Sequence, residues 1–180
     1  QTLSGVYRGF PAQVQFGLGV NMGKLIMKGS RPSNQFRGLH GRNTFFQTLH
    51  VRLEIPGSAG MPPLGIKEKV GILRTDEFLN EVIKQTRMEL PEMKIEHGLP
   101  RVRFYGNDAA FAARFAQDPE LKRLLSNWYF TDIRLGGTTV ELILDDNMVM
   151  PTFGGDRMSN PGYVVQALDI ASRVAELARS

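Results

Sequence analysis

The chain has 180 residues, of which 42% are apolar and 22% are charged, a composition typical of a globular domain with its own core. It contains no cysteine, which excludes disulfides, thiolate catalysis and cysteine-ligated zinc. No apolar run approaches the roughly 20 residues of a transmembrane helix, and the start lacks the features of a signal peptide. Because the chain begins at Gln1 rather than Met, we expect it to be trimmed from a longer chain, and a removed signal, anchor or upstream domain stays open as the missing part.

The charges are unevenly distributed along this chain, whose formal net charge is +4. Residues 1–53 contain no Asp or Glu. Their seven cations are Arg8, Lys24, Lys28, Arg31, Arg37, Arg42 and Arg52. A one-sided positive field suits an anionic neighbour, such as phospholipid headgroups, nucleic acid or an acidic protein. These seven side chains are therefore the predicted anion-contacting surface.

The first part of the chain is predicted to form strands joined by turns. Residues 6–7 and 12–16 flank turn residues at 8–11, which predicts a β-hairpin. Residues 17–41 contain six glycines and are predicted to be mainly a long loop, although residues 24–27 have the composition of a strand.

More strands are predicted further along. Apolar and polar residues alternate over residues 43–55, as in a half-buried strand. The Pro- and Gly-rich residues 56–63 predict a loop, and residues 64–74 resume as one or two strands. Another strand is predicted at residues 102–105.

Four helices are predicted from capping residues and apolar stripes. The first covers about residues 76–88, and the second covers residues 108–116 after a cap at Asn107. Asp118-Pro119-Glu120, a cap followed by a proline and an acid, begins the third. The last follows Ser159-Asn160-Pro161 and carries a continuous apolar stripe.

The clearest hairpin is predicted between residues 128–135 and 138–144, because Gly136-Gly137 accepts the positive φ that a two-residue turn requires. Strand runs with interspersed helices indicate an α+β fold, with a mainly antiparallel sheet and about three to four helices packed on it. The last helix is expected to cover the sheet that contains this hairpin. No repeat or long linker divides the chain, so residues 1–180 are predicted to form a single domain.

The sequence offers no complete catalytic or cofactor motif. The glycines of residues 17–24 have the wrong spacing for a phosphate-binding loop, and no predicted helix follows them. His40, His50 and His97 lack the spacing of metal ligands and are interpreted as surface histidines. We therefore predict no cofactor and no metal.

The best acidic cluster is Asp145-Asp146, with Asp156 further along the same predicted loop. Adjacent carboxylates can hold a hard cation, but the pattern of a calcium-binding loop is missing. We interpret these residues as solvated turn acids. A small-molecule enzyme that uses the Asp145 loop stays an alternative.

Aromatic residues accompany the cations. Phe36 neighbours Arg37, and Phe45-Phe46 follow Arg42. Interleaved arginine and aromatic residues can stack on nucleic-acid bases or lie at a bilayer interface. We favour the other interpretation, in which Phe45 belongs to the core and the cations form a solvated face, and a nucleic-acid-binding module stays the second alternative.

Several stretches carry a family resemblance. Leu3–Val14 is similar to the opening hairpin of an uncharacterised bacterial domain family, usually found downstream of an N-terminal transmembrane segment. Residues 41–45 and the run from Phe104 to Leu121 add to the resemblance, whereas the glycine-rich residues 17–41 and the loop 145–155 depart from it. The resemblance implies a domain tethered near a membrane, and it implies no reaction.

The expected function is that of a non-enzymatic, membrane-proximal binding or structural domain with a basic N-terminal third. Its expected partner is an anionic membrane surface or an acidic protein.

Overall fold

The computed structural model describes residues 2–20, 45–57, 60–68, 90–126, 132–145 and 161–180. Within them, eight strands form one sheet in the order β1-β2-β3-β8-β7-β4-β6-β5, and every neighbouring pair is antiparallel. The strands are β1 (Thr2–Tyr7), β2 (Phe10–Val20), β3 (Phe45–Glu54), β4 (Met61–Glu68), β5 (Glu92–Met93), β6 (Val102–Gly106), β7 (Asp132–Gly137) and β8 (Thr139–Asp145). The described helices are α3 (Ala109–Gln117), α4 (Pro119–Ser126) and α5 (Pro161–Arg179).

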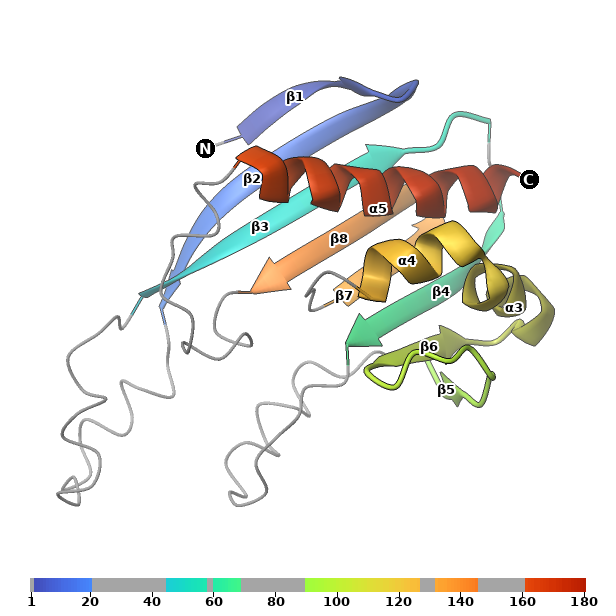
Figure 1. Cartoon of the computed structure of the whole chain (residues 1–180). Coiled ribbons are helices and arrows are strands. Elements are labelled where there is room, and N and C mark those ends of the chain that lie inside the picture. Colours follow the sequence, from blue (N-terminus) through green and yellow to red (C-terminus); the bar gives the residue numbers. More distant parts are fainter. Residues whose placement is uncertain (1, 21–44, 58–59, 69–89, 127–131, 146–160) are drawn as a thin grey trace, which may run out of the picture.

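This architecture confirms the predicted α+β class with an antiparallel sheet. The helices lie on one side of the sheet, where α5 contacts β3 and β8 and α3 contacts β6 (Figure 1). The expectation that the last helix covers the sheet containing the β7–β8 hairpin is therefore confirmed. Three helices are described, and the helix predicted at residues 76–88 lies outside the described residues.

The core lies between the sheet and these helices. In β3, Leu49, Val51 and Leu53 are fully buried because alternate residues of a strand point to the same face. They pack in one hydrophobic cluster with residues of α5, which buries small side chains such as Ala167 and Ala171 against the sheet. The apolar stripe predicted for the last helix is thus the surface that it buries.

Two strands extend into segments that were predicted to be loops. β2 continues through the predicted glycine-rich loop to Val20, because residues 45–48 of β3 pair with it and supply the hydrogen-bonding partners of an extended backbone. β4 begins at Met61, inside the predicted loop, and a register irregularity between Met61 and Leu64 accommodates the two prolines there. The possible strand at residues 24–27 lies outside the described residues.

Both tight hairpins have two-residue turns. The β1–β2 turn is Arg8-Gly9, with φ angles of 48° and 84°, as in a type I′ turn. The β7–β8 turn is displaced by one residue from the prediction: Gly136 pairs with Thr139, so the turn consists of Gly137 and Thr138. Gly137 supplies the positive φ, at 58°.

The caps of the two short helices are formed by aspartates. The cap of α3 is Asp108 rather than the predicted Asn107, and its Oδ1 accepts a hydrogen bond of 2.9 Å from the Phe111 amide. Asp118 caps α4 as predicted, accepting a 2.7 Å bond from the Leu121 amide. Its carboxylate also accepts hydrogen bonds from Arg173, which joins the start of α4 to α5.

Within the described residues, no helix is both long enough and apolar enough to cross a bilayer.

Candidate binding surface on the open face of the sheet

The face of the sheet opposite the helices, here called the open face, carries polar and charged side chains in rows across the strands. From β2 to β4, one row is Gln13, Arg52, Glu141, Arg134 and Gly65, and the next is Gln15, His50, Ile143, Asp132 and Lys67. Acids stand beside bases on neighbouring strands, the arrangement that stabilises cross-strand pairs. The described open face is therefore of mixed charge.

Glu141 is the centre of the first row. Its Oε1 lies 3.8 Å from Nη1 of Arg52, and its Oε2 lies 3.9 Å from Nε2 of His50. The Arg52 side chain is 46% exposed, so water screens this pair and its contribution to stability is small. The contacts nevertheless keep a carboxylate next to each of the two basic groups of β3.

Asp132 is buried within the open face, and Lys67 beside it is half-buried. The Asp132 side chain is only 5% exposed, and its Oδ2 lies 2.7 Å from Nη2 of Arg134, while its Oδ1 has no hydrogen-bond partner among the described residues. Lys67 is the cross-strand neighbour of Asp132. Burial lowers the pKa of Lys67, and the nearby carboxylate of Asp132 opposes this shift. These two groups can bind a polar partner, yet both already face an opposite charge.

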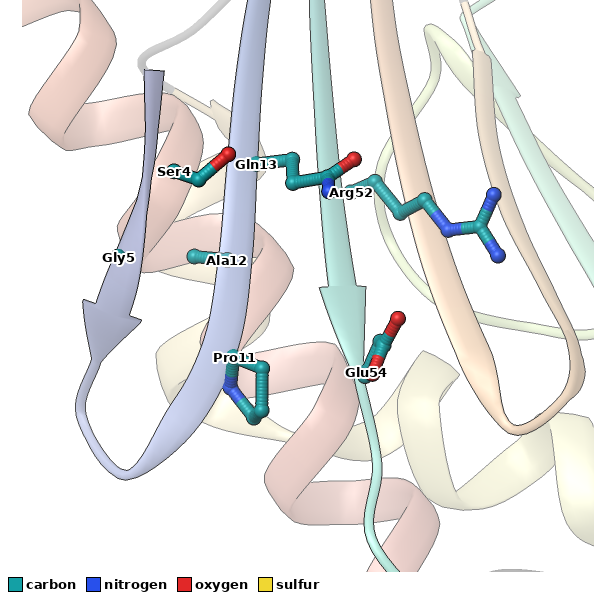
Figure 2. Close-up of a pocket in the computed structure, with 7 residues that line it drawn as sticks. All are labelled: Ser4, Gly5, Pro11, Ala12, Gln13, Arg52 and Glu54. Atoms are coloured by element: carbon teal, nitrogen blue, oxygen red, sulfur yellow. The ribbon is translucent and has the colours of Figure 1, made fainter.

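A shallow hollow of about 220 Å³ lies at the β1 end of the open face (Figure 2). Its lining residues are Ser4, Gly5, Pro11, Ala12, Gln13, Arg52 and Glu54. Figure 2 shows the Gln13 and Arg52 side chains extending away from β1 toward the centre of the sheet. The hollow thus offers a hydroxyl, an amide and a carboxylate for hydrogen bonding, and within its lining no nucleophile lies beside a base.

The structure separates the two described members of the predicted anion-contacting set. Nη2 of Arg8 lies 2.7 Å from Oδ1 of Asp169 on α5, whereas Arg52 extends over the open face toward Glu141. The Tyr7 hydroxyl donates to the same Asp169 oxygen at 2.8 Å, and burial together with this bond raises the pKa of Tyr7. Arg8 and Arg52 therefore do not form one joint surface.

The other five predicted cations, Lys24, Lys28, Arg31, Arg37 and Arg42, lie outside the described residues.

The histidines are less exposed than predicted. His50 and His97 are both half-buried, and His40 lies outside the described residues. The His97 ring lies 5.1 Å from that of Phe104, and its Nδ1 accepts a 3.0 Å hydrogen bond from the Leu99 amide. Burial lowers the pKa of His97, which favours the neutral ring. Its contacts are those of a packing residue.

The predicted acidic cluster is described only at its first member, because Asp145 ends β8 while Asp146 and Asp156 lie outside the described residues. Among the residues that the structure describes, no group of three His, Asp or Glu side chains is arranged to hold a metal ion.

The polar cluster of Asp132, Lys67 and Arg134 was not anticipated from the sequence. Strand alternation could have placed Asp132 and Arg134 on one face. Their meeting with Lys67 depends on the adjacency of β7 and β4, and four described elements (β5, β6, α3 and α4) separate these two strands in the chain.

No family model, curated protein or solved structure matches this chain.

Proposed function

We propose that this chain is a non-enzymatic, membrane-proximal binding domain whose basic segment, defined as residues 21–44, contacts an anionic surface. The segment joins the end of β2 to the start of β3. Its five cations are Lys24, Lys28, Arg31, Arg37 and Arg42, and it contains no acid. The whole chain carries a net charge of +4, so the remainder of the chain has a net charge of −1. This concentration of the positive charge is the observation that carries the proposal.

The ion pairs of the described residues support it. Arg8, Arg134 and Arg173 each lie within 2.7 Å of a carboxylate oxygen. A cation paired in this way contributes less to the field that a distant anionic partner meets. The uncompensated positive charge of the sequence is therefore in the basic segment, and the sheet is the scaffold that holds both of its ends.

A lipid surface is favoured as the partner because the family resemblance implies a domain that follows a transmembrane segment. Each Lys or Arg close to an anionic membrane contributes about 1 kcal/mol, so three or four of them contribute about 3–4 kcal/mol. That corresponds to millimolar affinity. Such an attraction orients a domain that is already tethered, and it does not recruit a free one.

Co-sedimentation with vesicles tests the proposal. We expect binding to phosphatidylserine-containing vesicles at low salt, and we expect it to decline at high salt because ions screen exposed charges. Neutral phosphatidylcholine vesicles should not bind. Equal binding to both vesicle types would contradict the electrostatic mechanism.

A nucleic acid is the competing partner, and a labelled single-stranded oligonucleotide in a fluorescence anisotropy titration tests it. Phosphate contacts give a log–log salt dependence of about −0.7 per neutralised phosphate, and each stacked base adds about 1–3 kcal/mol. The apolar alternation of the sequence predicts Phe45 and Phe46 on opposite faces of their strand, so we expect no joint stacking platform. Micromolar binding that Phe46→Ala abolishes would replace the membrane proposal with a nucleic-acid one.

A further inference from the structure

The two edges of the sheet differ in how they are protected. At one edge, β5 has two residues, one of which is Glu92, and Lys94 and Glu96 follow it. At the other, β1 has six residues, none of them charged, and all but Tyr7 are exposed. Among the described residues, β2 is the only strand that pairs with β1. Short length and charge are the usual protection against edge-to-edge pairing, and β1 has neither.

Exposed apolar side chains gather at this same edge. The large hydrophobic residues exposed in the described part of the chain are Leu3 (55%), Val6 (74%) and Val165 (45%). Leu3 and Val6 belong to β1. Val165 lies one helical turn before Asp169, which contacts Tyr7 at the end of β1 and Arg8 in the turn that follows, so Val165 lies on the side of α5 toward this edge. Strand alternation places Leu3 on the helix side of the sheet, as Val165 is, and Val6 on the open face, so both faces of this edge expose apolar side chains, as interaction surfaces do.

We propose that β1 pairs antiparallel with β1 of a second copy of this chain, around a two-fold axis that passes beside Ser4. A two-residue turn closes on a hydrogen-bonded pair, here Tyr7 and Phe10, and such pairs recur at every second residue. Gly5 and Leu3 therefore direct their backbone groups toward β2. Thr2, Ser4 and Val6 direct theirs outward.

The outward groups are self-complementary. In the register centred on Ser4, Ser4 faces Ser4 and Thr2 faces Val6, so every outward backbone N–H and C=O of these residues meets a partner. The two-fold axis is perpendicular to the sheet, which keeps paired side chains on the same face. The eight-stranded sheets of the two copies would then continue into each other.

The side chains fit the same register. Leu3 of one copy faces Gly5 of the other, and open space surrounds the position where Gly5 would carry a side chain. Ala12 of β2 is the cross-strand neighbour of Gly5. The surface depression that receives Leu3 is therefore lined by two small residues. Because of the two-fold axis, this contact occurs twice in the dimer. No like charges meet, because β1 carries no charged residue. Because the large residue (Leu3) and the depression at Gly5 that receives it lie on the same strand, the partner that fits this edge is a second copy of the chain.

Sedimentation velocity over a concentration series tests the proposal, with Ser4→Lys and Gln13→Lys as matched variants. Ser4 and Gln13 are cross-strand neighbours on the same face, but only Ser4 is at the edge. We expect the unaltered chain to dimerise with rising concentration. Ser4→Lys should lower the association constant at least about tenfold, because it places like charges opposite each other, while Gln13→Lys should dimerise like the unaltered chain.

Cysteine cross-linking tests the register independently, since the chain has no cysteine of its own. Paired Cα atoms in a hydrogen-bonded antiparallel pair are about 5.5 Å apart, a separation that a disulfide spans. Ser4→Cys should therefore form a disulfide-linked dimer on mild oxidation, and Gln13→Cys should form far less. A chain that stays monomeric at all concentrations would overturn the proposal, as would dimerisation that Ser4→Lys leaves unchanged or equal cross-linking of the two cysteine variants.

Discussion

The covered face and the open face of the sheet use alternate residues of the same strands in opposite ways. In β3, Leu49, Val51 and Leu53 are fully buried beneath α5, whereas His50 and Arg52 on the other face lie beside Glu141. The covered face is held by apolar burial, a large and cooperative contribution. The open face is held by ion pairs that water screens, a small contribution.

This difference indicates where a partner can act without opposing the fold. The charges of the open face compensate one another, so an anion that binds there competes with carboxylates already present. The basic segment has no acids of its own, and the β1 edge has no charge at all. These features are the reason for proposing the basic segment as the surface for anionic partners and the β1 edge as the surface for self-association.

The largest expected effect is a truncation on the covered face. Phe104 is 1% exposed, and Phe104→Ala should lower the free energy of unfolding by about 3–5 kcal/mol, because it removes buried apolar atoms and leaves a cavity. Arg103→Ala, one residue earlier in β6, removes a 2.9 Å pair with Glu92 on the exposed face and should cost less than about 1 kcal/mol. Urea unfolding measures the loss of unfolding free energy in each variant. Equal losses would contradict the claim that the covered face contributes more to stability than the open face.

The next effect concerns Asp118, which joins two helices of the covered side. Its carboxylate caps α4 and accepts a 3.0 Å hydrogen bond from Nε of Arg173, so Asp118→Ala should cost about 3 kcal/mol. Asp118→Asn can still cap the helix and should cost less. Thermal and urea unfolding of the two variants separate the cap from the ion pair, and an equal loss in both would assign the whole effect to the charge.

The same residue predicts a pH dependence. The hydrogen bonds from Arg173 lower the pKa of Asp118 below its unfolded value, so its contribution to stability is complete above about pH 4. It is lost as the pH falls through the folded-state pKa. In urea unfolding between pH 5 and pH 2, Asp118→Asn should therefore lose stability less steeply than the unaltered chain. Parallel pH profiles would contradict the assignment.

The smallest effect is expected at the centre of the open face. Glu141→Gln removes the charge that faces His50 and Arg52 across 3.9 and 3.8 Å, and it should change the free energy of unfolding by less than about 0.5 kcal/mol. Urea unfolding measures it. A loss above about 2 kcal/mol would show that the open-face charges act as a cooperative network.

Local patterns predicted most of the described elements. The alternation around Val51, the Asp118-Pro119-Glu120 cap and the stripe of α5 each depend on residues close together in the chain, and each was confirmed. The glycines that permit the two tight turns were also recognised, although the β7–β8 turn lies one residue later than expected.

The errors lie where distant segments decide the structure. β2 continues to Val20 because β3 pairs with it, and β4 includes Pro62 because the irregularity opposite β7 accommodates it. Neither partner can be recognised from residues nearby in the sequence. The same holds for the open-face cluster of Asp132 and Lys67, and for the separation of Arg8 from Arg52 onto opposite sides of the sheet.

The most direct test of the central claim compares two charge-matched variants in binding to phosphatidylserine-containing vesicles at low salt. The first, Lys24→Gln, Lys28→Gln and Arg31→Gln, removes three charges from the basic segment. The second, Arg52→Gln, Arg103→Gln and Arg134→Gln, removes three from the open face. Loss of about 3 kcal/mol of binding in the first variant with little change in the second is the predicted result. Binding that the second variant loses and the first retains would contradict the account and assign the anionic partner to the open face.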